Sequence, residues 1–362
     1  MVEDHARLGR ARSAAQLLHR PRSPSHPAEI AREVAGVQAQ DPRAGRLAFR
    51  ARNARLTAAD VDRARTEERS LLRTWAMRKT AHLIASDDAA WLLPLFEPQI
   101  AAWSRRRLGQ LGMDAATVKR GQRTMRRALG SEGPLTRAEL GDRLEREGIV
   151  LNAQTRTHMM GLAVTSGLAF QGPDRGAQPC LVLRVDWLAP SCGPHDREAA
   201  LRELARRYLR AFAPATEADF AGWSGLPLRD VRAGLEGIAP ELREVRIGGG
   251  VTALALRGRA RRASGPVVRL LPAFDTFLMG YRDRDFIAGP ERWPAIGPGG
   301  GLLHPTLVRD GRALGTWKAP AAARREVEVD LFEPLDAPTR GALDAEIADV
   351  ARFEARADPG SG

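Results

Sequence analysis

Apolar residues at helical spacing predict three short helices near the start of the chain. After a loose lead-in over residues 1–10, these helices cover Ala11–Arg20, a stretch from Pro27 to near Val37 with Ser25 as its cap, and Arg43–Arg52. Three short helices in succession, the last of them basic, are typical of a helix-turn-helix unit. An amphipathic bundle with solvated arginines is the alternative.

The next segment predicts a small hairpin. Leu71–Ala85 contains two short runs of strand character on either side of Met77-Arg78-Lys79. Such a hairpin would serve as the wing of a winged helix. His82 lies within the second strand, and we expect it to pack or to form a hydrogen bond rather than to catalyse.

A capping box, two helices and a hairpin then occur twice. The sequence TRAE at 136–139 is a capping box, a second helix starts at Asn152, and the residues from 167 onward read as strand, turn, strand. The same plan returns with TEAD at 216–219, a second helix, and a hairpin around the glycines at 248–250. This match predicts an internal repeat of winged helices, with a connecting helix over Leu201–Phe212.

From Pro266 the pattern becomes extended. VVRLLPAFDTFLMGYRDR predicts a long apolar strand, Asp310-Gly311 marks a hairpin turn, and RREVEVDLFEPL alternates as another strand. A helix over Pro338–Arg356 closes the chain, and the last few residues are expected to be disordered.

These elements predict an α+β fold of tandem winged-helix (helix-turn-helix) modules with a C-terminal β-rich element. The first three predicted domains are the winged helices, and the fourth is the β-rich domain with its terminal helix. Their bounds are residues 1–125, 126–195, 196–262 and 263–362.

The charge balance points to a polyanionic partner. The 362 residues include 56 Lys and Arg against 44 Asp and Glu, a net charge of +12, which favours nucleic acid. A general arginine bias of a GC-rich source is the alternative explanation. No apolar run reaches the roughly 18 residues of a membrane span, and no signal peptide or dimerisation heptad is evident. We therefore expect a soluble, cytoplasmic, nucleoid-associated monomer.

Metal and nucleotide chemistry find little support in the sequence. The two cysteines, Cys180 and Cys192, fit no zinc spacing, and neither an HExxH motif nor a P-loop occurs. The glycine runs at 248–250 and 299–301 read as hairpin and loop. We expect no metal and no cofactor.

Two neutral amides, Gln38 and Gln40, stand out beside so many arginines. Gly36 weakens a helix and Pro42 biases Asp41 away from helical geometry, so we expect this segment to be extended. Residues i and i+2 of an extended segment point the same way, so both amides would face one point and hold a water without titrating. A surface glutamine pair at a helix end is the plain alternative. Asp41 lies close enough to assist, but Asp-Pro is also a common turn element, which we favour.

Four stretches carry a family resemblance, in the order GVQAQDPRAGRLAFRAR, TWAMRKTAHLIASDDAAWL, LLPAFDTFLMGYRDR and DGRALGTWKAP. Over most of its length the chain resembles the bacterial winged-helix superfamily that contains the azinomycin-resistance DNA glycosylase and its interstrand-crosslink-unhooking relatives. The resemblance implies three winged helices in a C shape around DNA, completed by a β-rich element. It also implies a catalytic Gln-x-Gln motif, which Gln38 and Gln40 match, whereas the other main branch has Gln-x-Asp. Lys79 stands where many relatives have glycine before Thr80.

The resemblance and the residues together predict a monofunctional DNA glycosylase for bulky or interstrand-crosslinked N7-alkylpurines in duplex DNA, in repair or in self-resistance to an alkylating natural product. The base of an N7-alkylated purine is already positively charged and leaves without strong acid catalysis. What remains is to place a water at the sugar C1′ and to stabilise a cationic transition state. No lysine nucleophile is evident, so we expect no strand cleavage. A non-catalytic winged-helix DNA-binding regulator is the alternative.

Seven basic residues are candidates for contacts with phosphate or with the lesion: Arg43, Arg46, Arg78, Lys79, Arg282, Arg284 and Lys318. Taken singly, each is more often a solvated surface charge, but as a set they predict DNA binding that weakens steeply with salt. His304 precedes Pro305 at a predicted strand start, and we expect its role to be structural.

Overall fold

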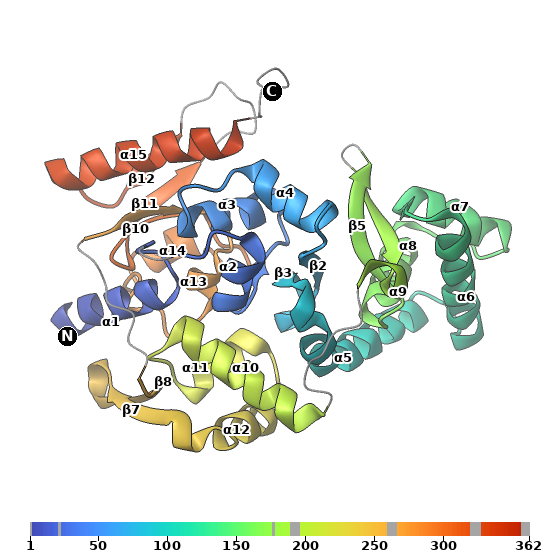
Figure 1. Ribbon diagram of the computed structural model, residues 1–362, viewed down its shortest axis with the longest axis horizontal. Coiled ribbons are helices and arrows are strands. Elements are labelled where there is room, and N and C mark those ends of the chain that lie inside the picture. The colour runs from blue at the N-terminus through green and yellow to red at the C-terminus, as the bar shows by residue number, and fades with distance from the viewer. Residues whose placement is uncertain are drawn as a thin grey trace. The chain divides into compact units, whose positions relative to one another are not determined.

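The computed structural model describes most of the chain: residues 2–20, 23–175, 178–188, 196–258, 266–318 and 327–355. The disorder predicted for the last few residues lies outside these ranges, as does Cys192. The fold is mixed α and β with antiparallel sheets, and it divides into two compact units (Figure 1). The first comprises Met1–Val61 with Leu201–Gly362, and the second comprises Asp62–Ala200. The division into four domains is finer than this and stays a prediction.

The N-terminal part of the first unit contains four helices and a short strand: α1 Val2–Ala15, α2 Pro27–Glu33, β1 Val37–Gln38, α3 Pro42–Arg52 and α4 Ala58–Thr66, the last of which ends in the second unit. The helix predicted at Arg43–Arg52 is confirmed. The cap predicted at Ser25 is wrong, because the His26 side chain accepts the hydrogen bond from the Ala28 amide.

Helix α1 begins before residue 10 and ends earlier than predicted. A loose lead-in over residues 1–10 is wrong because this stretch packs on a distant turn: a Cβ atom at Gly9 would lie 2.9 Å from the Asp310 carbonyl oxygen. Arg10 also pairs with the Asp310 carboxylate at 3.0 Å. The helix stops at Ala15, and Leu17 then adopts a positive φ of 62°, which an α-helix does not allow.

The structure contains the helices and the hairpin predicted within residues 196–262, and all of them lie in the first unit except the start of α10, at residues 197–200. Helices α10 (Arg197–Phe212), α11 (Glu217–Ser224) and α12 (Leu228–Glu236) precede the hairpin of β7 (Leu242–Arg246) and β8 (Thr252–Leu256). The capping box of Thr216 and Asp219 is confirmed, as is the hairpin, whose turn contains Gly249 and Gly250 at positive φ. The Tyr208 ring stacks on Phe220 at 4.6 Å in the core beneath these helices.

The C-terminal part of the first unit is a four-stranded antiparallel sheet in the order β12-β11-β10-β9, and α15 packs on β9. Its elements are β9 Val268–Leu271, α13 Thr276–Met279, α14 Trp293–Ile296, β10 Thr306–Arg309, β11 Arg312–Lys318, β12 Glu328–Leu331 and α15 Ala337–Glu354. The hairpin at Asp310-Gly311 and the closing helix are confirmed. The long strand predicted after Pro266 is wrong: Phe274 has a φ of 57°, and the Asp275 side chain then caps α13.

Among its described residues, the second unit combines the α-helices α5 to α9 with a sheet whose strands follow the order β3-β2-β5-β6-β4. Its elements are β2 Leu71–Trp75, β3 Ala81–Ala85, α5 Ala89–Gln110, α6 Ala115–Glu132, β4 Leu135–Thr136, α7 Arg137–Arg146, α8 Ala153–Thr165, β5 Ala169–Arg175, β6 Gln178–Leu183 and α9 Arg184–Trp187. The predicted hairpin around 77–79 is confirmed, and so are the capping box at Thr136 and the helix start at Asn152. Within the described ranges, no helix is both long and apolar enough to span a bilayer.

Two arginines of α3 are completely buried and join elements that are far apart in sequence. Both Arg52 terminal nitrogens reach the Asp275 carboxylate at 2.9 Å, and one also donates to Gln16 Oε1 at 2.9 Å. Arg50 pairs with Glu346 at 2.9 Å and donates to the Leu270 carbonyl oxygen. The alternative left open by the sequence, an amphipathic bundle with solvated arginines, does not describe these two residues, because each meets a buried carboxylate.

The N-terminal α3 and the C-terminal α15 therefore lie side by side, as Figure 1 shows for the blue and red helices. Breaking a buried ion pair by removing one partner is costly, because the other charge stays buried without compensation.

We expect Arg52→Met to lower the free energy of unfolding by about 3–5 kcal/mol, because Asp275 keeps a buried charge. Urea denaturation followed by circular dichroism measures the change. Arg63→Met is the control, since Arg63 and Glu68 form an exposed pair worth about 0–1 kcal/mol. Adding Asp275→Asn to Arg52→Met should recover part of the loss. Equal effects of the two single substitutions would show that the Arg52 pair is not a structural link.

Candidate active site

The Gln38-Ala39-Gln40 segment lies between two helices, with Gln38 at the end of a short strand and Gln40 in a bend. Helix α2 ends at Glu33, earlier than the predicted end near Val37, because Ala35 and Gly36 both have positive φ values of 59° and 93°. The chain then forms β1 over Val37–Gln38, which confirms the extended conformation there. The helix therefore ends before either glutamine.

Burial differs sharply along this segment. Val37 and Ala39 are fully buried, Gln38 is 5% exposed, and Gln40 is exposed. The buried Gln38 Oε1 atom has no hydrogen-bond partner among the described residues. An unsatisfied buried acceptor costs about 1–3 kcal/mol, so such an atom calls for a donor from water or a ligand. The segment thus presents one buried acceptor beside one exposed amide.

Asp41 has a structural role at the start of α3. Its Oδ1 atom accepts hydrogen bonds from the Arg43 amide at 2.8 Å and from the Ala44 amide at 3.1 Å, and Pro42 occupies the first helical turn. This is an N-cap. The preference for a turn role is confirmed, and α3 begins directly after the glutamine pair.

Gly45 allows α3 to pack closely against the segment. A Cβ atom at Gly45 would lie 2.9 Å from the Ala39 Cβ and 3.2 Å from the Ala39 Cα. Contacts below 3.0 Å require something to move. Since Ala39 separates the two glutamines, the small size of Gly45 sets where both amides lie.

The two candidate arginines of α3 differ in their surroundings. Arg43 forms two hydrogen bonds to the Glu354 carboxylate, at 2.6 and 2.7 Å, and this contact raises the pKa of the Arg43 guanidinium above its usual value. Its charge is therefore neutralised at the end of α15. Arg46 is half-buried, one turn further along α3. Contacts of Arg43 and Arg46 with DNA stay predictions. A phosphate contact is less favoured for Arg43, because Glu354 already pairs with it.

Three further candidates lie in the C-terminal part of the first unit. Arg282 and Lys318 are exposed, and the Arg282 amide is fixed by the Asp219 carboxylate at 2.8 Å. The half-buried Arg284 lies over the Trp293 ring at 4.9 Å, and burial lowers the pKa of its guanidinium. The exposed His304 donates its backbone amide to the Ile296 carbonyl oxygen at 2.8 Å, a structural contact.

Arg78 and Lys79 belong to the second unit, at the tip of the β2–β3 hairpin. Arg78 is half-buried and Lys79 is exposed, and their φ values of 52° and 60° lie in the left-handed region. Glycine adopts this conformation without strain, so the glycine that the family resemblance implies at the position of Lys79 would fit here. Nearby, His82 is buried and donates from Nδ1 to the Thr80 carbonyl oxygen at 2.9 Å, as expected. Burial and the Arg78 charge lower the pKa of His82 to about 3.

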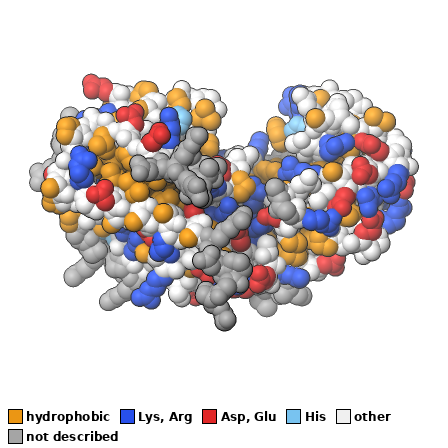
Figure 2. Space-filling model, turned by 90° about the horizontal axis from the view of Figure 1, so that it is seen from above, with side chains coloured by type: hydrophobic (Ala, Val, Ile, Leu, Met, Phe, Trp, Pro, Cys, Tyr) orange, Lys and Arg blue, Asp and Glu red, His pale blue; other side chains and the backbone are white. Residues whose placement is uncertain are grey.

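Basic side chains do not gather into one patch on the face drawn in Figure 2. Lys and Arg side chains are scattered there among Asp and Glu side chains. Many of the arginines are paired with carboxylates, as at Arg206 with Glu241 and at Arg143 with Glu132. Net charge alone therefore does not locate a nucleic-acid surface.

Comparison with known proteins identifies the family. The model of a family described as AlkZ-like DNA glycosylases matches residues 31–353. The chain belongs to this family. It is thus an enzyme of the DNA glycosylase class, which hydrolyses N-glycosidic bonds, and the resemblance inferred from its sequence motifs is confirmed.

An AlkZ-like relative supports this assignment along nearly the whole chain. The interstrand DNA cross-link repair glycosylase of Streptomyces sahachiroi is 28% identical over 364 residues, which cover 92% of each protein. The solved structure of the Streptomyces sahachiroi DNA glycosylase AlkZ superposes with a TM-score of 0.76 at 25% identity, covering 96% of both chains.

The sequence motifs did not reveal the residues that hold the Gln38-Ala39-Gln40 segment and α3 in place. Gly45, Asp275 and Glu346 act through packing and buried ion pairs, and nothing in their local sequence indicates a distant partner. The local sequence also does not separate the buried Arg50 and Arg52 from the half-buried Arg43 and Arg46 on the same helix.

We expect Gly45→Ala to reduce base release at least tenfold, because the new methyl group displaces Ala39 and with it both amides. Alanine is otherwise the better helix residue, so an effect of helix propensity alone would be stabilising. Ala39→Gly in the same chain should restore part of the activity by removing the Cβ that collides. Full activity of Gly45→Ala would contradict the positioning role. Single-turnover excision from alkylated DNA gives the rates.

Proposed function

We propose that this AlkZ-like protein releases N7-alkylated purines, bulky or interstrand-crosslinked, by hydrolysis with a water held between Gln38 and Gln40. The observation that carries this is the buried Gln38 Oε1 without a partner among the described residues, next to the exposed Gln40. The relative from Streptomyces sahachiroi is named an interstrand DNA cross-link repair glycosylase, which supports a crosslinked substrate.

The chemistry suits neutral amides. Alkylation at N7 places a positive charge on the purine, so the base leaves without a strong general acid. A carbonyl oxygen can accept a hydrogen bond from the attacking water, orient its lone pair toward C1′, and place a partial negative charge near the cationic sugar. In this proposal Asp41 serves as the N-cap of α3, since its Oδ1 accepts hydrogen bonds from the α3 amides. The reaction we propose is monofunctional, with no covalent intermediate on a lysine.

The proposed arrangement around DNA is a set of tandem winged-helix modules completed by the β9–β12 sheet. Two observations support it: α7, α8 and the β5–β6 hairpin follow a capping box, and α11, α12 and the β7–β8 hairpin follow another. The partner is duplex DNA with alkylated purines. The C-shaped arrangement, the monomeric state, the cytoplasmic location at the nucleoid and the lack of a cofactor stay predictions.

Replacing both Gln38 and Gln40 by Ala should abolish release of N7-methylguanine from duplex DNA while changing the duplex dissociation constant less than threefold. The physical reason is the loss of both water-orienting carbonyls with no change in surface charge. Abasic sites are revealed by alkali, and binding is followed by fluorescence anisotropy. Gln110→Ala, at an exposed glutamine of α5, is the control and should retain activity.

An unchanged rate in the double variant would refute the role of the glutamine pair. Loss of both activity and binding would instead indicate damage to the DNA surface. Strong preference of the inactive variant for one undamaged sequence would point to a regulatory DNA-binding role.

Binding to duplex DNA should weaken steeply with salt, and the steepness should show which of the candidate arginine and lysine side chains contact phosphate. Each phosphate contact contributes about 0.9 to the slope of log K against log salt concentration. Arg282→Gln and Lys318→Gln should each reduce this slope by about 0.9, whereas Arg43→Gln should leave it unchanged because Glu354 already neutralises Arg43. Anisotropy titrations at several salt concentrations measure the slopes. A flat dependence for the unmodified protein would rule out electrostatic binding by these residues.

A further inference from the structure

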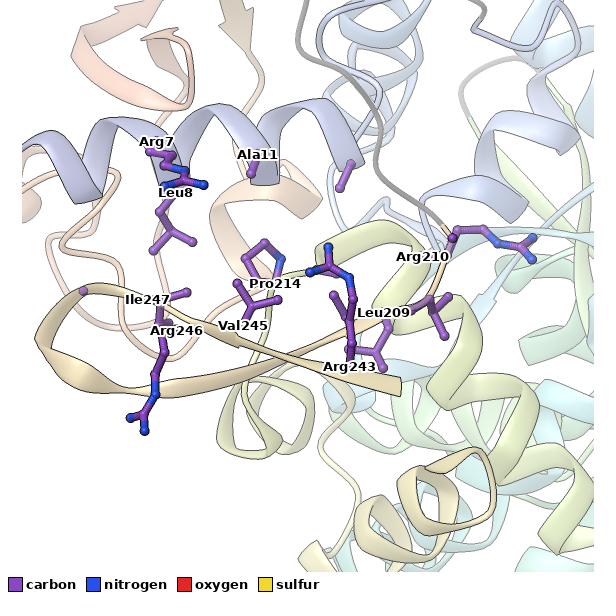
Figure 3. Close-up of a pocket in the computed structure, with 16 residues that line it drawn as sticks. Arg7, Leu8, Ala11, Leu209, Arg210, Pro214, Arg243, Val245, Arg246 and Ile247 are labelled. Atoms are coloured by element: carbon purple, nitrogen blue, oxygen red, sulfur yellow. The ribbon is translucent and has the colours of Figure 1, made fainter. Parts of the chain in front are cut away.

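A pocket of about 560 Å³ lies within the first unit, between α1 and the β7–β8 hairpin. Figure 3 shows α1 on one side and the hairpin on the other, with Pro214 at the back. The pocket is lined by one face of α1, the end of α10 with the loop that follows, and one face of the hairpin. Its volume falls in the range of about 300–1,000 Å³ that is typical of small-molecule sites.

The walls of this pocket are held in place by buried contacts, so the pocket is preformed. Arg12 of α1 donates from Nε to the Pro214 carbonyl oxygen at 3.0 Å, and it lies over the Tyr281 ring at 3.9 Å. On the hairpin side, Ala215 pairs with Leu254 of β8 through backbone hydrogen bonds at 3.1 and 2.8 Å. A preformed backbone lowers the ordering cost of binding.

The lining combines an apolar floor with positive charge. Leu8 and Ala11 of α1 face Val245 and Ile247 of the hairpin, with Leu209 beside them. Four arginines and no carboxylate line the pocket: Arg7, Arg210, Arg243 and Arg246. An anion with an apolar body matches both the apolar floor and the positive charge. A neutral apolar molecule would match the floor but would leave the arginines without a negatively charged partner.

The strand alternation divides the hairpin arginines between the two faces. In Figure 3, Arg243 projects from the hairpin toward α1, whereas Arg246 points away from the gap. Arg246 also donates to the Gly250 carbonyl oxygen at 2.8 Å, and Arg210 lies 3.5 Å from Glu33. Arg7 and Arg243 are exposed, and neither has an acidic partner within the described residues.

We propose that this pocket binds a small amphipathic anion, whose carboxylate or phosphate lies between Arg7 and Arg243 and whose apolar body lies on Leu8, Val245 and Ile247. The site is separate from the glutamine pair in sequence and uses none of the residues assigned to base release. Its occupancy does not depend on the glycosylase activity.

The test is calorimetric titration of the full-length protein with 2-naphthyl phosphate, 2-naphthoate and the neutral 2-naphthol. We expect at least one of the two anions to bind at least tenfold more tightly than 2-naphthol. Arg243→Glu should weaken that binding at least tenfold, and Ala11→Trp, which fills the pocket from the exposed face of α1, should abolish it. Arg246→Glu makes the same change of charge on the opposite face of the same strand and should change binding less than twofold.

Several results would overturn the proposal. These are equal binding of 2-naphthol and the anions, equal losses in Arg243→Glu and Arg246→Glu, or undiminished binding in Ala11→Trp. Displacement of the bound anion by duplex DNA would also overturn it, because the arginines would then belong to the DNA surface.

Discussion

The position of α3 depends on two buried arginines. Arg50 and Arg52 are fully buried, and their partners Glu346 and Asp275 come from α15 and from the cap of α13. Arginine suits such a place because its planar guanidinium binds a carboxylate with two parallel hydrogen bonds and stays charged when buried. The first unit brings its N-terminal helices and its C-terminal sheet together around this helix. Removing one partner is more damaging than an exposed substitution, because the remaining charge has no water to solvate it.

Helix α3 in turn positions the Gln38-Ala39-Gln40 segment, in which one buried hydrogen-bond acceptor has no partner among the described residues. Asp41 caps α3, Gly45 lets Ala39 pack on it, and the two glutamines lie on either side of Ala39. The buried Gln38 Oε1 keeps an unused acceptor among the described residues, a state that costs stability and recurs at functional sites. Neutral amides also keep the site free of a group that titrates near neutral pH. This fits a leaving group that is already activated by its own positive charge.

Local sequence signals predicted the elements whose causes are local. The capping boxes at Thr136 and Thr216, the turn at Asp310-Gly311 and the extended segment after Gly36 all depend on residues within a few positions of one another. The four stretches that include the Gln-x-Gln motif also led to the correct family, because their order along the chain is distinctive. The elements that were predicted wrongly depend on distant residues. Helix α1 extends over the lead-in because Gly9 packs on the turn at Asp310, and burial of Arg52 requires Asp275, 223 positions away.

The proposed mechanism requires the two amides to hold the water that attacks the sugar. A crystal structure of the protein with duplex DNA carrying a cationic pyrrolidine analogue of the sugar tests it most directly, because the analogue mimics the charge of the transition state. We expect one ordered water within about 3.2 Å of Gln38 Oε1 and of the Gln40 amide oxygen, on the side of C1′ opposite the leaving base. An analogue bound with no water there, or with both amides hydrogen-bonded to bases, would contradict it.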